Sequence, residues 1–241
     1  ASIHKITEFA KSAFAGPMLK KEIESINLVI ENQKKPVTCI IGGSKISTKI
    51  NVINSLIKKV DNLIIVGAMA NNFFAFKGLN IGRSLVEQNM LVSVEKIIIN
   101  AKNSNCEIEI PVDCKVGKEF TSPAKIKDLK NIKSEEMILD IGPKTIEKIC
   151  NIIYSSNTVM WNGPAGFFEN ENFLDGTLSI AKKISDDTEN KNLISVLGGG
   201  DTISAINKSD KKLNFTHLST AGGAFLEYIE GKDLPGLSVL K

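Results

Sequence analysis

Short, continuous runs of apolar and β-branched residues recur along the chain, and segments with a helical period separate them. Uninterrupted runs of this kind are typical of strands that are covered on both faces, as in parallel sheets with helical crossovers. The alternation predicts an α/β domain of the doubly wound, Rossmann-like type, with three layers and a mainly parallel sheet flanked by helices. The expected strands are residues 37–41, 62–66, 107–110, 137–141, 158–161, 192–197 and 216–218.

Two segments stand outside this alternation. Residues 16–32 predict a long amphipathic helix with Pro17 in its first turn, so we divide the chain into residues 1–32 and an α/β domain at residues 33–241. Lysine-rich residues 121–136 lack an apolar period and predict a solvated excursion without chemistry. We expect the apolar face of the first helix to be exposed and to favour self-association. This face consists of Leu19, Ile23, Ile26 and Ile30.

Glycines follow five of the apolar runs, where each strand gives way to a helix. Backbone N–H groups at helix N-termini are unpaired, and the helix dipole is positive there. Because the carboxyl ends of parallel strands share one edge of a sheet, these turns form a rim that suits a polyanion such as a phosphate chain. The glycines are Gly42, Gly67, Gly163, Gly198 and Gly222.

The turn after Gly43 carries the sharpest anomaly in the charge pattern. If Ser44 caps the next helix, Lys45 and Lys49 lie on one face of its first turns, which is the unfavourable end for positive charge. A phosphate group between the two lysines would offset this cost. Two solvated lysines in a lysine-rich chain are the alternative, and GGSKISTK lacks the spacing of a Walker phosphate loop.

The motif GGGDT places Gly198, Gly199 and Gly200 before Asp201 and Thr202. Glycine lets a backbone approach a ligand closely, and a helix that begins at Asp201 would direct amide groups toward that ligand. A carboxylate here suits a magnesium ion that bridges phosphates, because Mg²⁺ takes oxygen ligands and keeps several waters. A simple N-cap role for Asp201 is the alternative.

The motif WNGPAGFFE is the most specific of these features. Asn162, Gly163 and Pro164 predict a rigid, non-helical rim after a strand, and Gly166 permits the close approach of a flat ring. Glu169 is placed to accept hydrogen bonds from ribose hydroxyls. A Gly-Pro turn followed by core phenylalanines explains the motif equally well when it is taken alone.

The composition narrows the range of functions. Of 30 basic residues only Arg83 is an arginine, and the formal net charge is +3. Because arginine dominates base-edge readout, we do not expect nucleic acid as a partner. No apolar run reaches the roughly 20 residues of a membrane helix, so we expect no membrane association. Four cysteines without a CxxC spacing fit a reducing compartment and predict a cytoplasmic protein.

Together these motifs resemble the phosphoglycerate kinase family. The similarity runs along essentially the whole chain, in the order GPMLKKE, GGSKISTKI, VGAMANNFF, IGRSLVE, IPVD, DIGP, WNGPAGFFE, GGGDT, STAGGAFLEYIEGK and LPG. The resemblance implies that residues 33–241 are the nucleotide-binding domain. Residues 1–32 would then hold the interdomain helix and, at Ala1-Ser2, the end of the family's HRAHAS motif, and the family's N-terminal half would be absent from this sequence.

The resemblance implies reversible phosphoryl transfer from 1,3-bisphosphoglycerate to MgADP, which gives ATP and 3-phosphoglycerate. It assigns phosphate oxygens to Lys45 and Lys49, magnesium to Asp201 and the nucleotide phosphates to Thr202. Amides of Gly222 and Gly223 would face the transferred group. The other implied nucleotide contacts are Gly43, Gly67, Ala68, Asn162, Pro164, Gly166, Phe167, Glu169, Gly198, Gly199 and Gly200.

Two departures from the family pattern matter. Ala221 stands where the family usually has the first of three glycines, and alanine would be strained there if the position needs a positive φ. The STAGGA turn, which packing of small residues would also explain, therefore carries less weight than GGGDT. The family's glycerate-binding arginines have no counterpart, since only Arg83 is available and His4 and His217 are far apart in the sequence.

Three functions are compatible with these features. The first is the nucleotide-binding half of a phosphoglycerate kinase, which binds MgADP or MgATP alone but turns over little or no acyl phosphate, and whose full-length enzyme is a monomer. The second is a non-catalytic nucleotide-binding module that docks on a separate partner through the first helix and residues 235–241. The third is an NAD-dependent oxidoreductase, although neither GGSKIS nor GGGDT fits GxGxxG.

Overall fold

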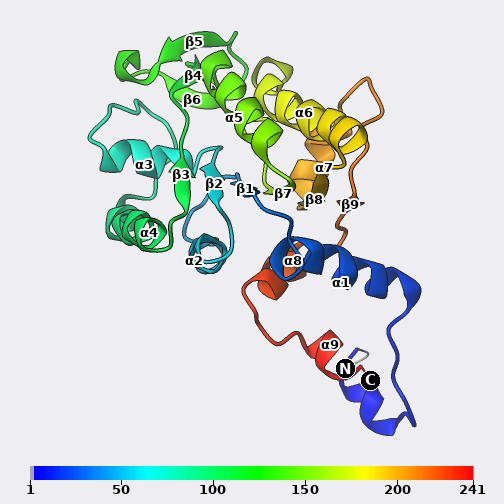
Figure 1. Cartoon of the computed structure of the whole chain (residues 1–241). Coiled ribbons are helices and arrows are strands. Elements are labelled where there is room, and N and C mark those ends of the chain that lie inside the picture. The colour runs from blue at the N-terminus through cyan, green and yellow to red at the C-terminus, as the bar shows by residue number, and fades with distance from the viewer. Residues whose placement is uncertain (1–2, 241) are drawn as a thin grey trace.

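The computed structural model of the chain describes residues 3–240, and its main feature is a six-stranded sheet in which all neighbouring strands are parallel. The strand order is β3-β2-β1-β7-β8-β9 (Figure 1). Helices cover both faces, so the predicted doubly wound, three-layer α/β architecture is confirmed. The strands are β1 Val37–Ile41, β2 Asn62–Ile65, β3 Glu107–Glu109, β7 Thr158–Asn162, β8 Ile194–Gly198 and β9 His217–Leu218.

The central strands place apolar side chains on both faces of the sheet. In β1, Cys39 and Ile41 pack into one core and Ile40 packs into the other. Because successive side chains of a strand point to opposite faces, one apolar run builds both cores. The first core contains α1 Pro17–Ile30, α2 Ile50–Ile57, α3 Ala70–Phe76, α4 Leu91–Asn103 and α8 Gly223–Ile229, and the second contains α5 Pro143–Ser155, α6 Asp175–Lys191 and α7 Gly200–Ile206.

A second sheet has three antiparallel strands in the order β5-β4-β6. Its strands are β4 Asp113–Gly117, β5 Lys125–Asp128 and β6 Met137–Ile141. The strand predicted at residues 137–141 is thus present, but it belongs to this sheet and not to the parallel one. The prediction of a solvated excursion over residues 121–136 is right for most of the segment, which is exposed. It misses β5, which forms there, and the buried Leu129 and Ile132.

Helix α1 packs against β7, β8 and α8. Ile26 and Ile30 are buried, so the predicted exposure of the apolar face of this helix is wrong for these two residues. Glu22 is buried as well, and its carboxylate accepts hydrogen bonds from His217 Nε2 at 2.9 Å and from the Ser219 hydroxyl. The first helix is therefore an integral part of one core.

The segment before α1 lies beside α9 (Pro235–Ser238), so the two ends of the described chain meet (Figure 1). The short 3-10 helix Lys5–Phe9 buries none of its residues. Ala1 and Ser2, which resemble the end of the HRAHAS motif, lie outside the described residues. No helix within residues 3–240 is long and apolar enough to cross a membrane. Exposed apolar side chains near this end are Ile3, Ile6, Phe9, Phe14 and Met18.

Candidate functional site

The candidate site lies at the carboxyl edge of the parallel sheet, where β1 and β7 are neighbours. After β1 the chain continues into α2 in one helical layer, and after β7 it continues into α6 in the other. The chain segments after these two strands therefore diverge toward opposite faces of the sheet, which makes this edge a topological switch point. A crevice at such a switch point is where doubly wound sheets bind ligands.

Gly42 and Gly163, which follow these two strands, pack backbone to backbone. A Cβ atom on Gly163 would lie 2.2 Å from the carbonyl oxygen of Gly42. A Cβ atom on Gly42 would lie 2.3 Å from the carbonyl oxygen of Pro164. The buried Trp161 indole donates a hydrogen bond to the Gly163 carbonyl at 2.7 Å. These two glycines are therefore required for contact between the loops.

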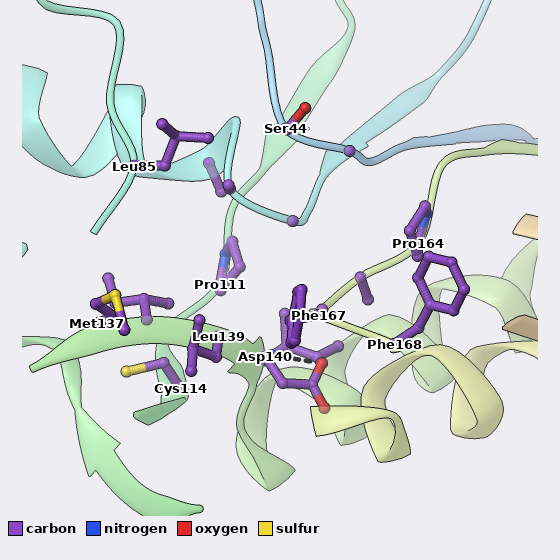
Figure 2. A pocket seen from close by; sticks show the side chains of 18 of the residues that line it. Ser44, Leu85, Pro111, Cys114, Met137, Leu139, Asp140, Pro164, Phe167 and Phe168 are labelled. Atoms are coloured by element: carbon purple, nitrogen blue, oxygen red, sulfur yellow. Dashed lines mark hydrogen bonds between the residues drawn. The ribbon is translucent and has the colours of Figure 1, made fainter. Parts of the chain in front are cut away.

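A cleft of about 410 Å³ opens between this edge and the second sheet. Gly67, Ala68, Gly166 and Phe167 line it, as does the exposed Glu169. In Figure 2, Leu85, Pro111, Met137 and Leu139 form the wall on one side of the cleft, Pro164 and Phe168 lie on the other, and Ser44 lies at the top. Such a cleft suits a flat, largely apolar ring.

A smaller cavity of about 200 Å³ adjoins the cleft, and four residues line both hollows. The shared residues are Gly43, Ser44, Pro164 and Asp201. A single ligand with a ring at one end and charged groups at the other could therefore occupy both hollows. The remaining residues of the smaller cavity are Lys45, Thr48, Lys49, Asn162, Gly163, Gly199, Gly200 and Thr202.

Lys49 is the more firmly held of the two lysines at the smaller cavity. Its Nζ donates hydrogen bonds to the carbonyl oxygen of Gly42 and to Oδ1 of Asn162, both at 2.8 Å. Desolvation by burial lowers the pKa of Lys49 to about 8, although the negative charge of Asp201 works in the opposite direction. An anion in the cavity would favour the charged form of this lysine.

The turn that carries the lysines differs from the predicted helix start. Helix α2 begins only at Ile50, with Lys49 at the N-cap position, so the prediction that Ser44 caps a helix is wrong. Residues 43–49 form bends and turns, and the buried Ile46 anchors them to the core. Lys45 therefore lies on a loop, and Lys49 lies at the N-terminus of α2 and not within its first turn.

The GGGDT turn begins α7 with Gly199 as the N-cap, at a φ of +100°. Asp201 lies within the first turn of this helix, so the alternative of an N-cap role for it is wrong. Its exposed carboxylate lines both hollows. Thr202 is fully buried, and its hydroxyl accepts a hydrogen bond from the Gly163 N–H at 2.7 Å, which joins this turn to the loop after β7.

Three glycines of the expected site, Gly198, Gly222 and Gly223, line neither hollow. A Cβ atom on Gly198 would lie 3.0 Å from the Phe225 ring, so this glycine serves packing. In the STAGGA turn the positive φ falls on Gly222, and Ala221 is not among the described residues with a positive φ. Alanine at this position therefore introduces no backbone strain.

Asp140 is a buried acid at the floor of the cleft that the sequence does not predict (Figure 2). Its carboxylate accepts hydrogen bonds from the N–H groups of Ile141 and Gly176, each at 2.9 Å. A Cβ atom on Gly166 would lie 2.4 Å from Asp140 Oδ1, so the loop after β7 rests directly on this side chain. Desolvation by burial raises the pKa of Asp140 from 3.8 to about 7.

The apolar wall of the cleft is likewise not predicted from the sequence. Its residues lie in or next to the motifs VGAMANNFF, IGRSLVE, IPVD and DIGP, which carried the resemblance without assigned roles. These residues are far apart in the sequence, because they come from α3, from the loop after it, from the segment between β3 and β4 and from the second sheet. They are Phe74, Leu85, Pro111, Met137 and Leu139.

Within residues 3–240 no three or more His, Cys, Asp and Glu side chains are grouped so as to hold a metal ion by themselves. Asp201 is a single carboxylate at the border of the two hollows. Because Mg²⁺ is commonly held by one or two carboxylates together with substrate phosphates and water, Asp201 fits a magnesium ion that arrives with a phosphate ligand.

Comparisons with known proteins identify the family of the chain. Residues 1–232 match the phosphoglycerate kinase family. The chain is 42% identical to the phosphoglycerate kinase of Francisella tularensis subsp. novicida over 100% of the chain and 61% of that relative. It is 42% identical to the phosphoglycerate kinase of a Chelativorans species over 95% of the chain and 58% of that relative.

Solved structures give the same result. The phosphoglycerate kinase from Coxiella burnetii superposes with a TM-score of 0.90 and 38% identity, over 100% of this chain and 62% of that one. The enzyme from Pyrococcus horikoshii gives a TM-score of 0.80 and 29% identity, over 99% and 60%. The chain thus spans about 61% of the length of the curated relatives it matches. The sequence and the fold of this chain match those of phosphoglycerate kinases along nearly its whole length, and the chain belongs to the phosphoglycerate kinase family.

Proposed function

We propose that this chain is the nucleotide-binding part of a phosphoglycerate kinase and that the two hollows hold one molecule of MgADP or MgATP. The observation that carries the proposal is the continuity of the cleft with the smaller cavity through Gly43, Ser44, Pro164 and Asp201. One hollow has mainly apolar walls and the other presents lysines and glycine backbone. A nucleotide has the same division between its base and its phosphates.

The cleft would take the base and the ribose. Gly67 and Ala68 follow β2, Gly166 and Phe167 follow β7, and all four line the cleft. Small residues there allow the backbone to lie close to the faces of a ring. The exposed Glu169 lies at the same cleft, where its carboxylate could accept hydrogen bonds from ribose hydroxyls.

The smaller cavity would take the phosphates. Lys45 and Lys49 supply positive charge, and the backbone of Gly199 and Gly200 also lines the cavity. Asp201 would hold the magnesium ion that accompanies the nucleotide. That ion supplies charge neutralisation for the phosphate oxygens. Asn162 would orient Lys49 through their 2.8 Å hydrogen bond.

In the proposed reaction a terminal phosphate oxygen of ADP attacks the phosphorus of the acyl phosphate, and the bond from that phosphorus to the carboxylate oxygen breaks. The products are ATP and 3-phosphoglycerate, and the protein contributes positioning and charge neutralisation. The one arginine of the chain, Arg83, pairs with Glu119 at 3.1 Å. We therefore propose that binding of the glycerate substrate requires residues other than those described here.

A second candidate function is a nucleotide-binding module that docks on a separate partner. The apolar side chains exposed before α1 and beside α9 favour it. Both candidate functions include nucleotide binding, so only a test for ATP formation distinguishes them. Adding the N-terminal half of the Coxiella burnetii relative should restore ATP formation if this chain is a kinase part, and nucleotide binding without ATP formation would favour the module.

Ligand titrations followed by Trp161 fluorescence and by calorimetry test the proposed function. Trp161 reports on the site because its indole is bonded to the Gly163 carbonyl in the loop of the cleft. We expect saturable binding of MgADP, weaker binding when magnesium is chelated, no binding of NAD, and no ATP formation from an acyl phosphate by this chain alone. Binding of NAD without binding of MgADP would refute the proposal in favour of a dinucleotide enzyme.

A further inference from the structure

Glu87 connects the segment before α4 to the loop that carries the two lysines. Its Oε2 accepts a hydrogen bond from the backbone N–H of Ser47 at 3.1 Å, and its Oε1 accepts one from the Ser47 hydroxyl. Ser47 lies midway between Lys45 and Lys49, in a lysine loop that we define as residues 43–49. One carboxylate therefore fixes the middle of this loop through both donors of one residue.

Glu87 is itself held in place by the core. Its N–H donates to Oδ1 of Asn72 at 3.0 Å, and the Asn72 side-chain amide donates to the Met69 carbonyl at 3.1 Å. The neighbouring Asn71 donates to the carbonyl of Leu85 at 2.9 Å. Both asparagines are fully buried on α3. A buried asparagine pair thus holds a short segment that supplies Leu85 to the cleft and Glu87 to the lysine loop.

The charge state of Glu87 suits this contact. Partial burial raises the pKa of its carboxyl, but the hydrogen bonds from Ser47 and the positive charge of Lys45 outweigh burial and hold the pKa below its ordinary value. The side chain is therefore an ionised acceptor at neutral pH. Hydrogen bonds to a charged acceptor are stronger than those between neutral groups.

We infer that Glu87 is a positioning residue for the phosphate end of the site, which holds the lysine loop so that Lys45 and Lys49 face the smaller cavity. The inference rests on the proposed function for the identity of the ligand. Without the Glu87 carboxylate, both polar groups of Ser47 lose their partner. The loop then keeps the anchor of Ile46, the hydrogen bonds of Lys49 and, at its start, the bond from the Met69 N–H to the Gly43 carbonyl at 3.0 Å. A ligand that needs both lysines would then have to order the loop on binding.

A positioning role and a purely electrostatic role predict opposite results. Removal of a negative charge next to a site for a polyanion strengthens binding if charge alone matters. Loss of a preorganised loop weakens binding. The direction of the change in MgADP affinity on Glu87→Ala therefore distinguishes the two roles.

The test is a calorimetric titration of MgADP and of adenosine into the wild-type chain, Glu87→Ala, Glu87→Gln and Glu95→Gln. Glu95 is an exposed glutamate of α4 and serves as the matched control for the change in charge. Glu87→Ala should raise the Kd for MgADP about tenfold, the equivalent of about one hydrogen bond to a charged group. Glu87→Gln should have a smaller effect, because its amide oxygen still accepts one hydrogen bond.

Adenosine has no phosphates, so its affinity should be the same in all four proteins. Unchanged or tighter MgADP binding by Glu87→Ala would overturn the inference, as would an equal loss of affinity for MgADP and adenosine, which would indicate general damage to the fold.

Hydrogen exchange of the ligand-free chain tests the same contact without a nucleotide. The Ser47 amide should exchange faster in Glu87→Ala than in the wild type, with no change in Glu95→Gln. If Ser47 exchanges faster in Glu87→Ala than in the wild type but the wild type does not bind MgADP, the Glu87 contact is supported and the proposed function is contradicted. Unchanged exchange at Ser47 would overturn the Glu87 contact even if MgADP binds.

Discussion

At the scale of single residues, two titratable groups of opposite sign lie at the candidate site, the partly buried Lys49 and the buried Asp140. Lys49 donates to Gly42 and Asn162 at the smaller cavity, and Asp140 accepts from Ile141 and Gly176 beneath the cleft. Burial moves both pKa values toward neutrality, to about 8 for Lys49 and about 7 for Asp140. Each group therefore gives the molecule a distinct dependence on pH.

The affinity for MgADP should fall as the pH rises through about 8, where the free chain loses the charge on Lys49. A bound polyanion favours the charged lysine, so above this pH binding requires uptake of a proton and weakens by up to about tenfold per pH unit. Calorimetry between about pH 6.5 and 9.5 measures the effect. Lys49→Arg, which stays charged, should show a flatter profile. An equally steep profile in Lys49→Arg would contradict this assignment.

The free energy of unfolding should depend on the ionisation of Asp140 at acidic to neutral pH. Because the pKa rises from 3.8 to about 7 on folding, the stabilising contribution is fully present below about pH 4 and is lost as the pH rises through about 7. Relative to Asp140→Asn, the free energy of unfolding should fall by up to about 1.4 kcal/mol per pH unit between these limits.

Urea unfolding of the wild type and of Asp140→Asn across this pH range measures the difference between their free energies of unfolding. Lys115 on β4 and Asp175 on α6 also act on Asp140, in opposite directions, and are the same in both proteins. Parallel stability curves for the two proteins would show that Asp140 ionises normally in the folded chain.

Residues whose chemistry is visible in a short motif could be predicted from the sequence. Lys45, Lys49 and Asp201 follow glycine-rich turns, and the structure places all three at the smaller cavity. Asp140 and Glu87 could not be assigned a role, because each depends on partners far away in the chain, such as Gly176 and Ser47. Only the fold brings these pairs together.

At the scale of elements, the parallel strands were predictable to within about two residues. The four central ones, β1, β2, β7 and β8, are mainly apolar runs with mainly buried residues. β4 and β5 were not predictable, since their sequences DCKVG and KIKD mix charged and apolar residues in short strands. The start of α2 was misplaced because Ile46 continues the helical period of the following residues but is buried as part of a loop. An apolar period therefore shows burial without fixing where a helix begins.

The docking of α1 should depend on Glu22. Its carboxylate joins this helix to His217 of β9, at 2.9 Å, and to the Ser219 hydroxyl. Glu22→Ala leaves buried donors without a partner and should lower the free energy of unfolding by about 1–3 kcal/mol. Glu24→Ala, on the same helix but with a side chain that is 65% exposed, should change it by less than about 0.5 kcal/mol. Equal effects of the two variants in urea unfolding would contradict the proposed docking contact.

At the scale of the whole molecule, exposed apolar side chains gather where the segment before α1 lies beside α9. Phe9, Phe14 and Met18 are 89%, 74% and 77% exposed. Exposed apolar groups clustered in this way favour association, so the chain should self-associate at high concentration. Light scattering should show Phe9→Ser with Phe14→Ser to be monodisperse where the wild type is not. A wild-type chain that stays monomeric at every concentration would contradict this expectation.

The central claim is that this chain alone binds a magnesium nucleotide across both hollows, with Lys45 and Lys49 at the phosphates. The most direct measurement is a calorimetric titration of MgADP into the wild type, the Lys45→Ala, Lys49→Ala double variant and a Lys58→Ala, Lys77→Ala control, whose lysines are exposed at the ends of α2 and α3. We predict saturable binding by the wild type and the control, and a loss of roughly tenfold or more in the Lys45, Lys49 variant. A folded wild-type chain that does not bind MgADP, or equal affinity in all three proteins, would contradict the account.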